Sequence, residues 1–189
     1  MDKEDARRAL RTLGELLASR GHHFELVAIG GSSLLLLDLA VRPTADVDVV
    51  ALVEEGVYRA ARPLPAVLDE AQAEVGVALG LGNQWLNPGP TDLLTFGLPE
   101  GFTERVETLE FAGLTVHLAS RLDQISFKLY AAVDQGHRSK HFADLKLLEP
   151  TVAELALAAR WVLQQDPSQG FRTVLLEVLG RFGVTSENL

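Results

Sequence analysis

Apolar residues recur at helical spacing near the start of the chain and again through its last third. Over residues 3–20 they return every three or four positions, which predicts a helix that ends before Gly21. From Ser120 onward the pattern again predicts helices. Ser120 and Asp123 have the spacing of a helix-capping box, with Asp in place of the usual Glu or Gln.

Between these helical regions lie short runs typical of strands. Residues 24–29 (FELVAI) form one apolar run, and the valine-rich residues 46–53 (DVDVVALV) form a second. Residues 106–111 and 114–118 flank an Ala-Gly dipeptide, so they predict a hairpin with a two-residue loop.

The connecting segments are less regular. After a Gly-Gly pair, Ser32 or Ser33 is expected to cap a helix that continues to about Ala40. A further helix is expected within residues 58–79, interrupted near two prolines, and residues 91–96 are interpreted as a strand.

Together these elements predict an α/β (α+β) fold, in which helices flank a small mixed sheet and a helical part follows. We expect a core domain over residues 1–119 and a helical C-terminal part over residues 120–189, packed on that core.

The composition agrees with a packed globule. Of the 189 residues, 47 % are hydrophobic, and no apolar run reaches the roughly 18 to 20 residues of a membrane span. The charged, amphipathic N-terminal segment lacks the features of a secretion signal, so a soluble cytoplasmic protein without a membrane partner is expected. The net charge of −9 argues against a nucleic-acid partner, because phosphate contacts need clustered Lys and Arg.

Two acidic residues interrupt the valine-rich strand. Asp46 and Asp48 are two positions apart, so their side chains share one face with Cα atoms about 6.5 Å apart. Like charges this close disfavour each other, and a bound cation relieves the repulsion. Because the chain has no cysteine, any metal would be held by oxygen or imidazole, which favours Mg²⁺ or Mn²⁺.

The sequence Gly30-Gly31-Ser32-Ser33 supplies a complementary part. A strand that enters a helix through glycines exposes backbone N–H groups to an anion, and glycine lets a phosphate approach closely. Each motif alone has a plain structural explanation, as a helix entry or a solvated strand edge. Their order, a glycine turn followed by an Asp-x-Asp strand, favours a site for phosphate and metal.

The stretch IGGSSLLLLDLAVRPTADVDVVAL resembles the signature of the nucleotidyltransferase-fold superfamily. Its R-x-T-x-D-x-D part is most similar to the abortive-infection AbiEii-like branch, which includes toxins of bacterial toxin–antitoxin pairs. The resemblance continues through QWLNPG, LPEGF and ISFKLYAAVDQGHRSKHFADLKLL, and so covers roughly residues 24–150.

This resemblance implies roles for individual residues. Asp46 and Asp48 would bind magnesium, Lys128 would neutralise triphosphate charge, and Asp144 matches an acid of a later segment of the family. In the resulting hypothesis, Asp144 or Asp92 positions or deprotonates the acceptor. Asp92 is the candidate for a third metal-binding carboxylate. The residues expected to bind the nucleotide are Gly30, Gly31, Ser32, Ser33, Arg42 and Lys128.

Two departures from the family pattern stand out. In the segment SKHFADL the family's first aspartate is missing or replaced by His141, and the third strand carboxylate is not evident. Lys128 also has a second interpretation, because it lies at the border of an apolar helix stripe from which a lysine can extend to solvent. Trp85 and Trp161 are interpreted as packing residues.

The leading hypothesis is a metal-dependent nucleotidyltransferase that moves a nucleoside monophosphate from an NTP to an acceptor hydroxyl. By resemblance the acceptor is a tRNA 3′ end or another RNA, and the protein is a toxin with a cognate antitoxin. Two alternatives stay open. The chain is a catalytically weak member that binds a nucleotide or a protein, or it modifies a protein or small molecule.

The segment HRSKHFADLK is locally basic in an acidic chain. It contains two histidines besides its Arg and Lys residues. It is either a solvated helix start or a landing site for a nucleotide or RNA end.

Overall fold

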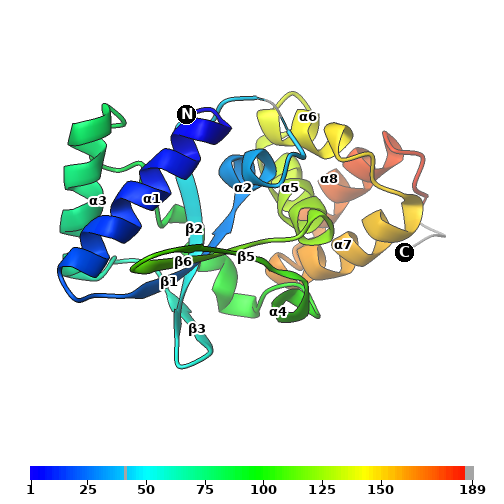
Figure 1. The fold of residues 1–189 in the computed structure, drawn as a ribbon. Helices are drawn as coiled ribbons and strands as arrows, with labels where there is room; N and C mark the ends of the chain where they lie inside the picture. Colours follow the sequence, from blue (N-terminus) through cyan, green and yellow to red (C-terminus); the bar gives the residue numbers. More distant parts are fainter. Residues whose placement is uncertain (41, 186–189) are drawn as a thin grey trace. The chain divides into compact units, whose positions relative to one another are not determined.

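The computed structural model of the protein (Figure 1) describes residues 1–40 and 42–185. The described chain divides into two compact units. The first contains Met1–Leu94 and Arg105–Ala119, and the second contains Thr95–Glu104 and the chain from Ser120 onward. Residues 186–189, the end of the predicted helical part, lie outside the described residues.

The first unit combines a mixed sheet with helices, which confirms the predicted fold class (Figure 1). The sheet order is β3-β2-β1-β6-β5, with β1 parallel to β6 and the other neighbours on this path antiparallel. The elements up to β6 are α1 (Lys3–Ser19), β1 (Phe24–Ile29), α2 (Gly30–Leu36), β2 (Val47–Glu54), β3 (Val57–Ala60), α3 (Ala66–Leu79), β4 (Leu86–Asn87), the 3₁₀ helix η1 (Gly89–Phe96), α4 (Phe102–Arg105), β5 (Glu107–Phe111) and β6 (Leu114–Leu118).

The core of this unit joins the apolar stripes of α1 and α3 to one face of the sheet. Leu13 of α1, Leu68 of α3 and Val116 of β6 belong to one cluster and are fully buried. Burial of one such side chain contributes roughly 1.5–3 kcal/mol. The predicted helix at residues 3–20, the strand at 24–29 and the hairpin of β5 and β6 are confirmed within a residue or two.

A β-bulge interrupts the pairing of β1 with β2. Val27 pairs with Ala51, but Ala28 pairs with Val49, so β2 contains one extra residue between them. The alternation of core-facing side chains along β2 shifts by one residue at the same place. Val47 and Val49 belong to the core cluster, and the next member along the strand is Leu52 instead of residue 51. A bulge redirects side chains in this way. Its consequence is that Asp48, rather than Val49, lies opposite Ile29 at the end of β1.

The predicted helix over residues 58–79 is wrong in its first part. Residues 57–60 form β3, which follows β2 through a two-residue turn, and the helix begins only at Ala66. Glu55 and Gly56 have φ angles of 52° and 76°. Positive φ at both central residues matches the twist of a tight hairpin, and this local geometry prevails over the helical spacing.

Two further local predictions are wrong. Residues 91–96 belong to the 3₁₀ helix η1 rather than to a strand. Prolines at 88 and 90 cannot donate to a strand ladder, and the Thr91 hydroxyl instead accepts a hydrogen bond from the Ala61 N–H at 2.8 Å. In α2, Gly30 is already the first residue and Ile29 precedes it as the cap without a side-chain hydrogen bond. Ser32 and Ser33 therefore lie inside the helix.

The second unit is helical, as predicted. Besides most of α4, it contains α5 (Arg121–Gln135), α6 (Lys140–Leu147), α7 (Val152–Gln165) and α8 (Gln169–Gly180). A Ser or Thr side chain caps each of these helices by accepting a backbone N–H three residues on. Within residues 1–40 and 42–185, no helix has both the length and the apolar character to cross a membrane.

Both tryptophans pack as predicted. Trp85 is buried in the first unit, where its indole N–H donates to the Gln72 carbonyl at 2.7 Å. Trp161 lies edge-on to Phe127 in the second unit, and its N–H donates to the Gly97 carbonyl at 2.9 Å. Each indole therefore combines apolar burial with a satisfied donor.

Arg121 connects three helices of the second unit. Its guanidinium donates to the Glu154 carboxylate of α7 at 2.5 Å and to the Leu148 carbonyl after α6 at 2.5 Å. Glu154 also completes the capping box of α7 by accepting the Thr151 N–H. The Arg121 hydrogen bonds hold the pKa of Glu154 below its ordinary value, and those from Thr151 act in the same direction.

We predict that Glu154→Gln lowers the free energy of unfolding at neutral pH by roughly 0.5–1 kcal/mol. A carboxylate with a lowered folded-state pKa contributes stability above its unfolded-state pKa and loses it as the pH falls through the folded value. The difference from wild type should therefore disappear in acid. Urea denaturation between pH 7 and pH 3 measures it, with the exposed Glu177→Gln as control. A difference that stays constant with pH would contradict this explanation.

Candidate functional site

The two aspartates of the Asp-x-Asp motif lie at the start of β2. Asp46 immediately precedes the strand and Asp48 is its second residue, and both are half-buried. The intervening Val47 is fully buried in the core cluster. The carboxylates thus lie on the face of the strand away from this core, as the two-residue spacing predicts.

A third side chain joins the two carboxylates. The Asn87 side-chain NH₂ donates to Asp46 Oδ2 at 3.2 Å and to Asp48 Oδ1 at 2.8 Å. Asn87 reaches this position because β4 runs parallel to the start of β2, with Asn87 in register with Asp48. One amide therefore holds both carboxylates, which places their oxygens close together.

The glycine turn lies directly against Asp48. Gly30 follows β1, whose last residue Ile29 lies opposite Asp48, and it has a φ of +75°. A Cβ atom on Gly30 would collide with Asp48 Oδ2. Next to it, a Cβ on Gly31 would come 3.1 Å from the Thr44 hydroxyl, which itself donates to the Asp46 carbonyl at 3.3 Å. Only glycine at position 30 leaves this carboxylate oxygen its space.

The donor set fits a hard divalent cation. Such a cation prefers carboxylate oxygens, and magnesium is held by one or two of them together with water and phosphate oxygens. Asp46 Oδ2 and Asp48 Oδ1, which converge on the Asn87 NH₂ group, meet this requirement. Within residues 1–40 and 42–185, no group of three or more His, Asp or Glu side chains is placed to hold a metal ion.

The serines of the turn are enclosed in the first unit. Ser32 and Ser33 are fully buried, and the Ser32 hydroxyl lies 3.5 Å from the Ile29 carbonyl, to which it donates. The Ser33 hydroxyl has no hydrogen-bond partner among the described residues. The predicted capping role is wrong because the two glycines already turn the chain into α2, which leaves both serines in its first turns.

Lys128 and Asp144 form an ion pair inside the second unit. Lys128 Nζ lies 2.8 Å from Asp144 Oδ2, and the two side chains are 4 % and 5 % exposed. The alternative that Lys128 extends to solvent is therefore wrong, because Asp144 of α6 draws its ammonium inward. This geometry supports a structural role, and a role on a triphosphate would require the pair to open.

The remaining predicted residues lie at the surface. Asp92 is an exposed residue of η1 and pairs with Arg62 at 2.9 Å, so the structure does not group it with the two strand aspartates. Arg42 is exposed and follows Val41, which lies outside the described residues. In the basic segment, Lys140 and Lys146 are exposed, and Lys146 lies 5.1 Å from the centre of the Phe142 ring.

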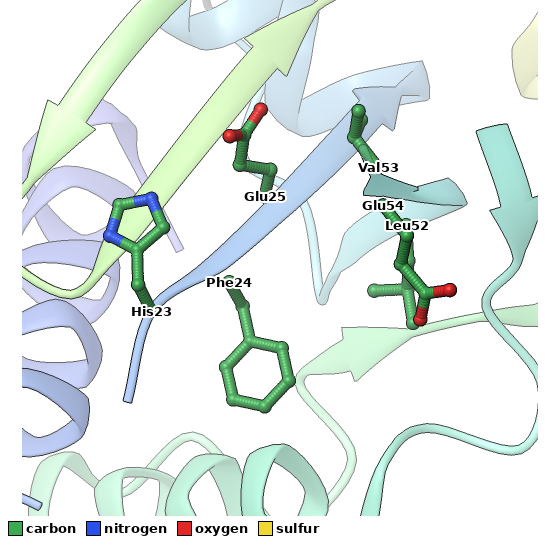
Figure 2. A pocket seen from close by; sticks show the side chains of 6 residues that line it. All are labelled: His23, Phe24, Glu25, Leu52, Val53 and Glu54. Atoms are coloured by element: carbon green, nitrogen blue, oxygen red, sulfur yellow. The ribbon is translucent and has the colours of Figure 1, made fainter. Parts of the chain in front are cut away.

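A separate pocket lies at the other end of the β1–β2 pair (Figure 2). Its volume is about 260 Å³, and it takes residues from the start of β1 and the end of β2. Because the two strands are antiparallel, this is the end remote from Asp48. Its lining residues are His23, Phe24, Glu25, Leu52, Val53 and Glu54.

Asn87 is the site residue that sequence reasoning missed. The segment QWLNPG enters the sequence analysis only as part of the resemblance, with no role for Asn87, because β4 contains two residues and has no periodicity. The available signal was an Asn-Pro pair after the apolar Trp85-Leu86, since asparagine often folds its side chain back onto a turn. Here the Asn87 side-chain oxygen accepts the Gly89 N–H at 3.0 Å.

We predict that Gly30→Ala destabilises the protein more than Gly21→Ala. The two glycines have φ values of +75° and +74°, but a Cβ on Gly21 meets no atom within 4 Å. Both substitutions carry the cost of a left-handed backbone, roughly 1–2 kcal/mol. Gly30→Ala adds a collision with Asp48, typically a further 1–3 kcal/mol. Urea denaturation of both variants tests this, and equal losses would show that the close contact is unimportant.

We predict that Lys128→Met lowers the free energy of unfolding by about 3–5 kcal/mol, because it removes the ammonium from a buried carboxylate. The double variant Lys128→Met/Asp144→Leu should recover much of this loss, since no buried charge is left behind. Lys140→Met, an exposed lysine of α6, serves as the control. A loss below about 1 kcal/mol, or a double variant no more stable than the single one, would contradict a structural ion pair.

Comparison with known proteins identifies one family. The family described as "Nucleotidyltransferase of unknown function (DUF6036)" matches residues 8–139, a range that contains Asp46, Asp48, Asn87 and Lys128 and ends before Asp144. Comparisons with curated proteins and with solved structures gave no significant match. The matched range covers most of the 189 residues and includes the strands β2 and β4 and the glycine turn of the site. The chain therefore belongs to the DUF6036 family of nucleotidyltransferases of unknown function.

Proposed function

We propose that the protein transfers a nucleoside monophosphate from an NTP to an acceptor hydroxyl in a magnesium-dependent reaction. The observation that carries this proposal is the convergence of Asp46 and Asp48 on one amide, beside a glycine turn. The family description supports nucleotidyl transfer as the reaction type. The NTP, the metal dependence and the acceptor are parts of the proposal.

In the proposed reaction, the acceptor hydroxyl loses its proton to solvent, its oxygen forms a bond to the α-phosphorus of the NTP, and the bond to the leaving pyrophosphate breaks. Magnesium, when bound, supplies positive charge for the attacking and leaving oxygens. Asp46 and Asp48 would hold it, because one oxygen of each converges on the same side-chain amide. The missing Cβ of Gly30 would keep the Asp48 carboxylate in place for the metal, directly against the start of α2.

For the acceptor we propose an RNA 3′ end, with tRNA as the first candidate. The similarity of the R-x-T-x-D-x-D segment to AbiEii-like toxins supports this choice. The exposed basic residues around α6 would provide local positive charge for RNA phosphates, although the chain as a whole carries a net charge of −9. In the same proposal the protein arrests growth and is neutralised by a cognate antitoxin.

We predict that the purified protein labels RNA when it is incubated with α-³²P NTPs, Mg²⁺ and total RNA. Asp48→Asn should reduce the rate at least about 100-fold, because it removes one charged ligand of the metal. Asp134→Asn, an exposed residue of α5, is the matched control and should retain full activity. Thermal unfolding of each variant establishes that it is folded.

Periodate treatment of the RNA sharpens this experiment. Oxidation destroys the 3′-terminal hydroxyls, so it should abolish labelling if the 3′ end is the acceptor. Labelling of protein or a small molecule in a lysate would contradict the RNA acceptor but retain nucleotidyl transfer. Incorporation that is unaffected by Asp48→Asn, or absent with every acceptor, would contradict the proposed activity. Growth arrest that requires Asp48 would support the toxin role.

A further inference from the structure

The Asn87 side chain has its orientation fixed from two sides. Its oxygen accepts the Gly89 N–H at 3.0 Å, so its NH₂ group must face the two aspartates. That NH₂ donates to one oxygen of each carboxylate, at 3.2 Å and 2.8 Å. The positive end of a neutral amide therefore lies where two carboxylate oxygens converge.

A bridging cation would draw on these same oxygens. We infer that Asn87 is a positioning residue. Its NH₂ group holds one carboxylate oxygen of Asp46 and one of Asp48 close together at the place where the cation would bind. This inference rests on the proposed function, because it concerns the same metal site. It goes beyond that function by giving a role to a residue outside the Asp-x-Asp motif.

The amide also limits the charge of the site. Asn87 is in register with Asp48 on the neighbouring strand, which is a position from which a carboxylate could serve as a third metal ligand. An amide there contributes a dipole instead of a negative charge. Cation affinity rises with the number of charged ligands, so the native site should bind free cation weakly and bind it more tightly together with a triphosphate.

Substitution by aspartate separates this role from a purely structural one. Asn87→Asp keeps the oxygen that accepts the Gly89 N–H, so a residue needed only for the turn would tolerate the change. The same substitution replaces the donor NH₂ by a third carboxylate oxygen. The control Asn83→Asp adds the same charge at an exposed position four residues earlier.

The experiment measures Mn²⁺ binding by calorimetry, with and without a non-hydrolysable NTP analogue. We expect Asn87→Asp to bind free Mn²⁺ at least about tenfold more tightly than wild type. The analogue should strengthen Mn²⁺ binding less in this variant than in wild type. Without metal, Asn87→Asp should melt at a lower temperature, and Mn²⁺ should raise its Tm by more than it raises that of wild type. Asn83→Asp should match wild type in all these measurements.

A Mn²⁺ affinity of Asn87→Asp within about twofold of wild type would overturn the inference. An equal gain in Asn83→Asp would do the same, because it would show a general effect of charge. If Asn87→Asp does not fold, nitrogen-15 NMR of the wild-type protein gives the answer. The chain has three asparagines, and Mg²⁺ should shift the side-chain NH₂ signals of Asn87 but not those of Asn83. Unchanged Asn87 signals at saturating Mg²⁺ would overturn the inference.

Failure of this inference and failure of the proposed function have different signatures. If Asp48→Asn abolishes Mn²⁺ binding and Asn87→Asp leaves it unchanged, the metal site stands and the role of Asn87 is wrong. If Asn87→Asp strengthens binding as expected but no acceptor is labelled by wild type, the role of Asn87 stands and the proposed reaction is wrong.

Discussion

The repulsion between two neighbouring carboxylates is the constraint around which the candidate site is organised. Asp46 and Asp48 share one face at the start of β2, where two like charges this close repel each other. The protein instead directs an amide donor at both of them. A half-buried, oriented asparagine directed at both carboxylates thus keeps their two negative charges close together.

Three pieces of backbone geometry bring these groups together. The bulge between β1 and β2 places Asp48 opposite Ile29, so the turn that follows β1 meets its carboxylate. The positive φ of Gly30 and its missing Cβ leave room for that carboxylate oxygen. The short parallel strand β4 then brings Asn87 into register from the other edge of β2. Each contribution comes from a strand end supported by a packed sheet, which gives a precise arrangement without a long loop.

Much of the fold around the site can be predicted from the sequence, because the elements concerned have regular periods or local capping signals. The helix α1, strand β1 and the β5–β6 hairpin have regular periods, and the capping serine of α5 has a local signature. The pairing of Asp46 with Asp48 on one face follows from strand geometry alone. The elements that were misassigned depend on longer-range or finer effects. β3 requires the turn at residues 55 and 56, and η1 follows from two prolines.

The parts of the site that could not be predicted are contacts between segments. Asn87 and Asp48 are 39 positions apart, and their contact depends on a strand of two residues and on a bulge that no single-sequence pattern reveals. Lys128 illustrates the same limit. At the border of an apolar helix stripe, the Lys128 side chain can either extend to solvent or be buried. It is buried because its ammonium donates to Asp144, sixteen residues later.

The two sets of charged residues singled out by the resemblance therefore differ in kind. Asp46 and Asp48 are half-buried and are held by a neutral amide, which can yield its hydrogen bonds to a cation without leaving a buried charge behind. Lys128 and Asp144 are almost fully buried and form an ion pair with each other. Opening that pair would remove their mutual attraction while both charges stay buried. Under the proposed function, a cation at the first set would compete with the hydrogen bonds of a neutral amide, whereas a triphosphate at the second would have to separate a buried ion pair. The geometry of Lys128 and Asp144 therefore supports a structural role inside the helical unit, and the proposed metal site is assigned to the strand aspartates.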